Sequence, residues 1–117
     1  MDIDFTQTDS ALAAIEKFCP QEIYNLAAVS SVASSWQNPI LAMEVNGYAV
    51  ERLIRGICEL PNLSEIRFFQ AGSTDMVGKS LISSQETYFS PWSPYGESKE
   101  LARKAIVCAR NNLDCGL

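Results

Sequence analysis

The sequence predicts an α/β fold built on a parallel sheet, and two observations carry that prediction. Short apolar runs, which suit buried strands, alternate along the chain with segments whose apolar residues recur every three to four positions, as in helices. The resulting order of helix, strand, helix, strand, helix is typical of parallel strands joined by right-handed crossovers. Two such strands do not complete a doubly wound sheet, because both faces and both edges need cover. We therefore expect residues 1–117 to be the central part of a larger α/β domain.

The first half of the chain supplies one helix, one strand and one loop. A helix is expected from about Thr8, with Ile15 on its apolar face, and it ends before Pro20 because helical backbone is disfavoured before a proline. Residues 22–28 form a short apolar run of the kind buried in a parallel sheet. The small residues 30–35 that follow are expected to form a loop.

The second half repeats the pattern with a longer helix. Apolar residues recur at helical spacing over 40–60, which predicts a long amphipathic helix stopped by Pro61. Residues 66–71 are expected to be the second buried strand. The polar stretch 78–92 is too irregular for an element.

Composition limits the classes of function. The chain carries a formal net charge of −5, and its nine basic residues are scattered, so DNA and RNA are not expected partners. No apolar run approaches the ~20 residues that span a bilayer. Histidine is absent, which argues against a metal site, and we expect four reduced thiols in a cytoplasmic protein. Those thiols are Cys19, Cys58, Cys108 and Cys115.

The final helix carries the most informative pair of residues. Ser93 suits the N-cap and Pro94 the first turn, so the helix is expected to begin there and to end near Asn111-Asn112. Tyr95 and Lys99 are four residues apart and therefore share a helix face. A lysine ammonium near a phenol favours the phenolate, a base able to take a proton from a substrate hydroxyl. The structural alternative is a solvent-facing helix pair.

The ends of the two strands are the expected place for a ligand, because loops at the carboxyl ends of parallel strands form the crevice of open α/β sheets. The first end has small residues, which let a cofactor approach the backbone. The second end offers the hydroxyls and carboxylate of 73–75, which could hold a substrate oxygen and move a proton. A helix-capping turn is the alternative interpretation of 73–75.

Several motifs in register resemble a known family. They are EIYNLAAVSSV at 22–32, SWQNP at 35–39, RFFQAGS at 67–73, QET at 85–87 and SPY at 93–95. Together they are similar to the extended short-chain dehydrogenases/reductases (the NAD-dependent epimerase/dehydratase family), and in particular to the GDP-mannose 4,6-dehydratase branch. The resemblance implies a Rossmann-type doubly wound sheet, of which this chain holds about two strands and three helices. It also implies that the Gly-rich N-terminal half and the C-terminal substrate domain lie outside 1–117.

The resemblance implies that the full-length parent is an NADP-dependent lyase acting on a nucleotide sugar, with GDP-mannose expected, and that residues 1–117 alone are inactive. Such an enzyme oxidises the sugar at C4, eliminates water across C5 and C6, and returns the hydride to C6. Tyr95 matches the tyrosine that deprotonates the 4-hydroxyl, and Lys99 matches the lysine that assists it and binds the nicotinamide ribose. Ser73 matches the residue that hydrogen-bonds the 4-oxygen, and Asp75 matches the acid/base of the elimination.

The resemblance also implies positions that line the cofactor. These are Asp4 near the adenine, the backbone at Leu26, Ala27, Ala28 and Ser30, and Asn46, which matches a common structural or active-site asparagine. The residues that select NADP over NAD follow a strand outside this chain, so NAD stays open. The resemblance further implies a homo-oligomer formed through the two long helices.

Departures from the family keep other interpretations open. Asp75 stands where this branch has Glu, and Thr74 could be the hydroxyl in use, as in the Thr-Asp-Glu signature of dTDP-glucose 4,6-dehydratases. No Gly-x-x-Gly-x-x-Gly loop is present to hold a pyrophosphate. A nucleotide-sugar 4-epimerase or 4-reductase would need Tyr95 and Lys99 without the elimination carboxylate. A non-catalytic Rossmann-like interaction fragment is the alternative from another class.

Overall fold

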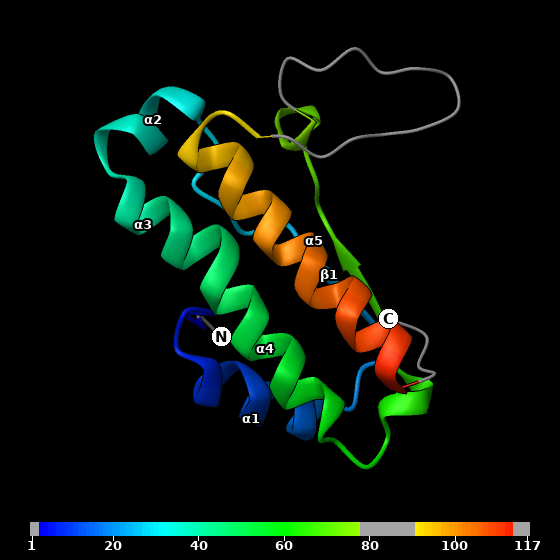
Figure 1. The fold of residues 1–117 in the computed structure, drawn as a ribbon. Coiled ribbons are helices and arrows are strands. Elements are labelled where there is room, and N and C mark those ends of the chain that lie inside the picture. Colours follow the sequence, from blue (N-terminus) through cyan, green and yellow to red (C-terminus); the bar gives the residue numbers. More distant parts are fainter. Residues whose placement is uncertain (1–2, 78–90, 114–117) are drawn as a thin grey trace.

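The computed structural model describes residues 3–77 and 91–113. Helices lie side by side on one face of a two-stranded parallel sheet (Figure 1). The helices and strands, in chain order, are α1 (Thr8–Phe18), β1 (Glu22–Asn25), α2 (Val32–Gln37), α3 (Pro39–Met43), a π-helical segment (Glu44–Tyr48), α4 (Ala49–Cys58), β2 (Arg67–Gln70) and α5 (Pro94–Leu113). Short 3-10 turns occupy Leu63–Glu65 and Thr74–Met76. The predicted alternation of helices with parallel strands is confirmed.

The sheet has one covered face and one open face. β1 and β2 pair in parallel, with Ile23 opposite Phe68 and Tyr24 opposite Phe69. Side chains alternate across a strand, so Ile23 and Phe68 face the helices and contribute to the core. Tyr24 and Phe69 lie on the other face, where they are 63% and 51% exposed and their ring centroids are 5.7 Å apart.

The core lies between the sheet and the helices. α4 supplies most of it, because its apolar residues recur at helical spacing and point one way. Val50, Ile54 and Ile57 of α4 are almost fully buried against Ile66 and Phe68 of the second strand region. α5, which packs beside α4, adds Ala102 and Ile106.

The predicted long helix is present from Pro39 to Cys58, but it is not a uniform α-helix. Asn38 caps its start by accepting a 3.1 Å hydrogen bond from the Leu41 N–H, and Pro39 follows at the first position. The five residues Glu44–Tyr48 form a π turn, which the apolar spacing did not predict. Such turns insert one extra residue into an α-helix and are frequent at functional sites.

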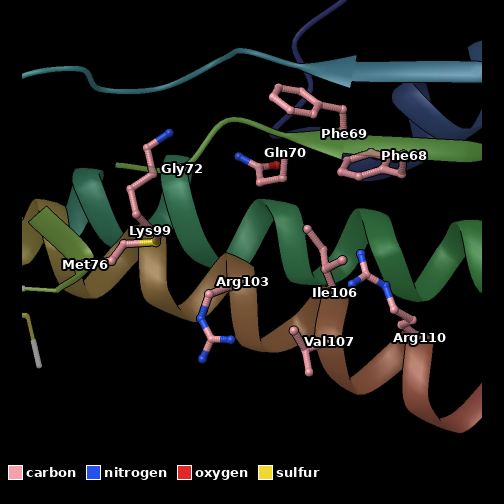
Figure 2. A pocket seen from close by; sticks show the side chains of 10 residues that line it. All are labelled: Phe68, Phe69, Gln70, Gly72, Met76, Lys99, Arg103, Ile106, Val107 and Arg110. Atoms are coloured by element: carbon pink, nitrogen blue, oxygen red, sulfur yellow. The ribbon is translucent and has the colours of Figure 1, made fainter. Parts of the chain in front are cut away.

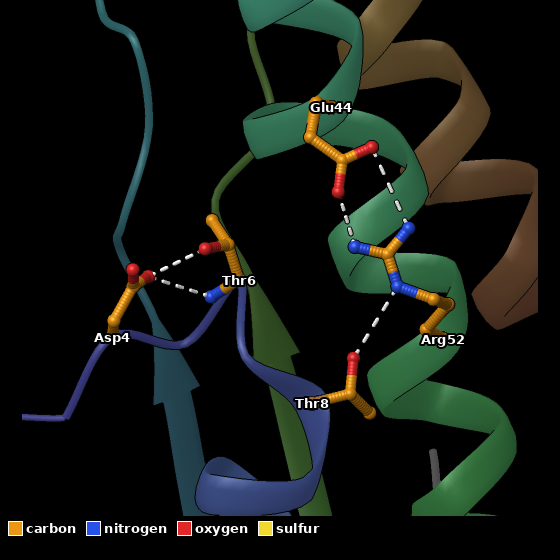
Figure 3. Close-up of polar contacts among 5 residues, drawn as sticks. All are labelled: Asp4, Thr6, Thr8, Glu44 and Arg52. Carbon is orange, nitrogen blue, oxygen red and sulfur yellow. Dashed lines mark hydrogen bonds and ion pairs between the residues drawn. The ribbon is translucent and has the colours of Figure 1, made fainter.

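An ion pair bridges this π turn. The guanidinium of Arg52 makes two contacts with the Glu44 carboxylate, and its Nε donates to Thr8 Oγ1 at 3.3 Å (Figure 3). The side chains are 43% and 42% exposed, and Glu44 raises the pKa of Arg52 above its ordinary value. Glu44 is the first residue of the turn and Arg52 lies in α4 after it, while Thr8 opens α1. The pair therefore joins three segments at the surface.

Two expectations for the first half need correction. Residues 32–35 are not loop: α2 forms there because Ser31 accepts a 3.2 Å hydrogen bond from the Ser34 N–H and caps the helix. The strand expected over 22–28 ends at Asn25. The end of α1 agrees with expectation, and Cys19 takes a left-handed conformation there, with a φ of 46°.

Part of the expected polar stretch, 78–90, lies outside the described residues, as do the QET motif at 85–87 and Cys115. Cys19, Cys58 and Cys108 are thiols. Within 3–77 and 91–113, no helix combines the length and hydropathy that a bilayer crossing requires.

Candidate active site

The first turn of α5 is built as the sequence predicts. Ser93 is 1% exposed and its Oγ accepts a 3.0 Å hydrogen bond from the Gly96 N–H, while its carbonyl accepts from Glu97 N–H at 2.9 Å. Pro94 occupies the first helical position, where its missing N–H costs nothing. This cap fixes where the helix starts and therefore where Tyr95 sits.

Tyr95 and Lys99 lie on the same face of α5. The Lys99 Nζ is 5.9 Å from the centroid of the Tyr95 ring, within the range of a cation–π contact. The same ammonium donates a 3.1 Å hydrogen bond to the carbonyl of Ala71, just beyond β2. Figure 2 shows the Lys99 side chain rising from α5 toward the end of that strand. Lys99 is 4% exposed, and this burial lowers its pKa below the ordinary value of 10.5.

Ser73 and Asp75 form a compact polar turn after β2. The Ser73 Oγ donates to Asp75 Oδ2 at 2.9 Å and accepts from the Asp75 N–H at 3.2 Å. Ser73 thus caps the short turn Thr74–Met76, as the capping interpretation predicts. The hydroxyl and the carboxylate nevertheless stay half-buried, and Thr74 is exposed. A hydroxyl bonded to a carboxylate is also an arrangement that can pass a proton.

The polar turn is held directly against the helix that carries Tyr95. A Cβ added at Gly96 would fall inside contact distance of the Asp75 carbonyl oxygen and 3.1 Å from Pro91 Cβ. Only glycine permits this approach of two backbones. This approach could not be predicted from the sequence, because the contact joins segments 21 positions apart by backbone atoms alone.

The segment after β1 is open and small, and it is fixed by one buried amide. Leu26, Ala27 and Ser30 are exposed, and Ala28 is half-buried. Asn46 is fully buried in the π turn; its Nδ2 donates to the Val29 carbonyl at 3.0 Å, and its Oδ1 accepts from the Val29 N–H at 2.8 Å. Asn46 therefore acts on this segment through Val29.

Asp4 lies before α1, away from the residues on α5. It is exposed, and its carboxylate accepts hydrogen bonds from the hydroxyl and the N–H of Thr6, at 2.6 and 3.0 Å (Figure 3). These hydrogen bonds lower the pKa of Asp4. The structure thus brings Ser73, Asp75, Tyr95 and Lys99 together, and it leaves Asp4 in a separate place.

Lys99 also belongs to a groove that the sequence did not predict. The groove has a volume of about 360 Å³ and runs between β2 and α5 (Figure 2). Phe68, Gln70 and Gly72 form its strand side, and Arg103 and Ile106 lie on its helix side. A four-residue spacing along α5 would have suggested that Lys99 and Arg103 share this face.

The residues present fit one end of a nicotinamide dinucleotide. Exposed small residues after β1 leave backbone accessible, and Tyr95 and Lys99 stand beside the neighbouring strand end. The chain has no Gly-x-x-Gly-x-x-Gly loop for the pyrophosphate. The residues described here therefore fit the nicotinamide end of such a cofactor.

Solved structures share this fold closely. RMD from Pseudomonas aeruginosa, complexed with NADPH, matches with a TM-score of 0.82 and 19% identity over 98% of this chain and 39% of its own. A UDP-glucose 4-epimerase from Brucella ovis, in complex with NAD, matches with a TM-score of 0.83 and 17% identity over 98% of this chain and 35% of its own. The chain thus has the Rossmann-type fold of the nucleotide-sugar epimerases and dehydratases.

Sequence comparison is more specific. The family model for GDP-mannose 4,6 dehydratase matches residues 1–115, so the chain belongs to that family. The GDP-mannose 4,6-dehydratase of Sinorhizobium fredii (strain HH103) is 30% identical over 106 residues, which cover 89% of this chain and 30% of the relative. The chain spans about a third or less of the length of the relatives it matches.

Proposed function

We propose that this chain carries the catalytic centre of a nucleotide-sugar 4,6-dehydratase, a lyase that converts GDP-mannose to GDP-4-keto-6-deoxymannose. The observation that carries the proposal is the position of Tyr95 and Lys99 beside the turn 71–75. A phenol, an ammonium, a hydroxyl and a carboxylate meet there at the carboxyl end of a parallel strand, where α/β folds bind ligands.

Each residue has a role that its contacts support. Tyr95 takes the proton of the 4-hydroxyl, and the adjacent Lys99 ammonium stabilises the phenolate that results. The hydrogen bond from Lys99 to Ala71 fixes the ammonium between α5 and the strand end. Ser73 hydrogen-bonds the 4-oxygen, with the exposed Thr74 as the alternative hydroxyl.

Asp75 serves the elimination step. Its carboxylate removes the proton from C5 and then passes a proton to the leaving 6-hydroxyl, so water departs across C5 and C6. The carboxylate already accepts the Ser73 hydroxyl at 2.9 Å, so Ser73 can hold it in place or relay a proton to it. Asp75 is one methylene shorter than the Glu of this branch, and the close contact at Gly96 supports its reach by drawing the turn against α5.

The proposed cofactor is NADP, with NAD as the alternative. It would lie along the backbone at Leu26, Ala27, Ala28 and Ser30, with Asp4 toward the adenine and Lys99 on the nicotinamide ribose. When bound, it would supply the chemistry of accepting a hydride and returning it. Asn46 would not contact the cofactor but would fix this backbone through its two hydrogen bonds to Val29.

Two alternative functions stand beside this proposal. A nucleotide-sugar 4-epimerase or 4-reductase is supported by the similarity of fold to the Brucella ovis epimerase. Such an enzyme would use Tyr95 and Lys99 but not the carboxylate of Asp75. A non-catalytic Rossmann-like interaction fragment is the alternative from another class, and it would show neither activity.

The proposed setting is a cytoplasmic homo-oligomer formed through the long helix and α5. Three large apolar side chains on the long helix support this assembly: Ile40, Leu41 and Tyr48 are 82%, 47% and 46% exposed. Exposed apolar side chains grouped on one element are typical of an interface.

The experiment compares Asp75→Asn with Tyr95→Phe in the complete gene product, supplied with GDP-mannose and NADP. Asp75→Asn is expected to abolish the dehydrated product, detected by its mass, while slow C4 oxidation persists. Tyr95→Phe is expected to lower both by about 100-fold or more. Tyr24→Phe, a tyrosine on the open face of the sheet, is the matched control. Unchanged dehydration in Asp75→Asn would favour the epimerase or reductase.

A further inference from the structure

Trp36 and Trp92 form an aromatic pair that the active-site residues leave unexplained. Their ring centroids are 6.5 Å apart and the rings are tilted by 42°. Trp36 is 56% exposed and Trp92 is 48% exposed, although they come from segments more than fifty positions apart. Two large aromatic surfaces brought together yet left half in water are typical of a ligand-binding surface.

The pair is placed by the same segments that form the candidate active site. α2 begins at Val32, directly after the segment that would line the cofactor, and it ends at Gln37 beside Trp36. Ser35 is fully buried on the inner side of α2, with its Oγ donating to the Val32 carbonyl at 2.6 Å. This leaves Trp36 on the outer side. α2 packs against α5 at the end of the molecule that holds the strand ends (Figure 1).

Trp92 reaches the site from the other direction. It precedes the N-cap Ser93, and Tyr95 follows within one helical turn. Its neighbour Pro91 lies against Gly96, which also contacts the Asp75 carbonyl. Trp92 is therefore next to the residues proposed to act on C4, C5 and C6 of the sugar, rather than on the nucleotide.

We propose that Trp36 and Trp92 form a subsite for the pyranose ring of the substrate. The C–H groups on one face of a pyranose pack on the electron-rich face of an aromatic ring, and two tilted rings offer such faces at one place. This proposal rests on the proposed function, since it takes the ligand to be a nucleotide sugar. A nucleobase or a second copy of the chain could also cover the pair, and each predicts a different result below.

Tryptophan fluorescence of the 117-residue chain tests the subsite, because the chain contains two tryptophans and both belong to the pair. GDP-mannose is expected to quench the emission and shift it to shorter wavelength. Methyl α-mannoside is expected to do the same with weaker half-saturation, and GDP to leave the emission unchanged. Trp36→Leu and Trp92→Leu should each raise the half-saturating concentration of GDP-mannose about fivefold to tenfold, as measured through the remaining tryptophan. The corresponding Phe variants, which keep a ring, should raise it less.

The variants are checked for folding by circular dichroism, and Phe69→Leu, an exposed aromatic on the open sheet face, is the control that leaves the titration unchanged. An equal response to GDP would overturn the proposal in favour of a nucleobase. Emission that depends on protein concentration without sugar would overturn it in favour of a second copy, and no response at millimolar sugar would overturn it outright. If Tyr95→Phe retained full dehydration while the sugar response persisted, the proposed function would fail and the subsite would stand.

Discussion

The amide of Asn46 and the backbone of Val29 exchange two hydrogen bonds, and through them the π turn of the long helix holds the segment after β1. Both amide atoms are fully buried, so neither bond competes with water. This relationship connects a helix on one face of the sheet to the open segment proposed to line a cofactor. Variants of Asn46 can test this relationship through the stability of the chain, without any ligand.

Replacing Asn46 with Leu should destabilise the chain by about 2–3 kcal/mol, because the N–H and carbonyl of Val29 would remain desolvated without partners. Urea unfolding followed by circular dichroism measures the loss. Gln37→Leu, an exposed amide at the end of α2, is the control and should change the free energy of unfolding by less than about 0.5 kcal/mol. Equal effects of the two variants would contradict a structural role for the Asn46 bonds.

Replacing Gly96 with Ala should be costly, by about 1–3 kcal/mol, since the new methyl group would meet the backbone carbonyl of Asp75 and push the two segments apart. Thermal unfolding measures the effect. Gly72→Ala is the matched control, because its Cβ would meet only the flexible end of Met76, at 3.0 Å. A Gly96→Ala variant as stable as Gly72→Ala would show that α5 and the turn 74–76 are not in close contact.

Lys99 should make the free energy of unfolding vary with pH in the alkaline range. Burial lowers the pKa of its ammonium in the folded chain, so the unfolded chain binds this proton more tightly. The free energy of unfolding should therefore rise with pH between the lowered pKa and the ordinary value of 10.5. Lys99→Met should abolish that contribution in urea titrations across the window. Lys104→Met, at an exposed lysine on the same helix, should retain it.

The ion pair between Glu44 and Arg52 should make a small but measurable contribution to the free energy of unfolding. In a double-mutant cycle with Glu44→Gln and Arg52→Gln, we expect a coupling free energy of about 0.5–1 kcal/mol, limited by the exposure of both side chains and favoured by the two-contact geometry. The coupling should shrink in high salt. A parallel cycle on Glu51 and Arg55, a pair four residues apart within α4, gives the value for an ordinary helical pair.

The sequence predicted the features of the fold that depend on neighbouring residues, such as helix caps and helical spacing. The start of α5 followed from Ser93 and Pro94, and the shared face of Tyr95 and Lys99 followed from their spacing. α2 was missed because its small polar residues have no apolar period, and its formation depends on the cap at Ser31.

The site was less predictable where backbone atoms take part. A carbonyl such as that of Ala71, which binds Lys99, has no signature in the sequence. The approach of Gly96 to Asp75 arises only when the chain folds and brings distant segments together. The aromatic pair of Trp36 and Trp92 has the same origin, since nothing in either local segment indicates the other.

The π turn at Glu44–Tyr48 has a consequence for comparing and engineering such chains. Such a turn accommodates one extra residue while the helix on either side keeps nearly the same phase. Removing one residue there would leave Ile54 in register with the core but would take Asn46 out of register with Val29. An alignment should therefore place no gap within Glu44–Tyr48, and a graft of this helix should transfer these five residues together.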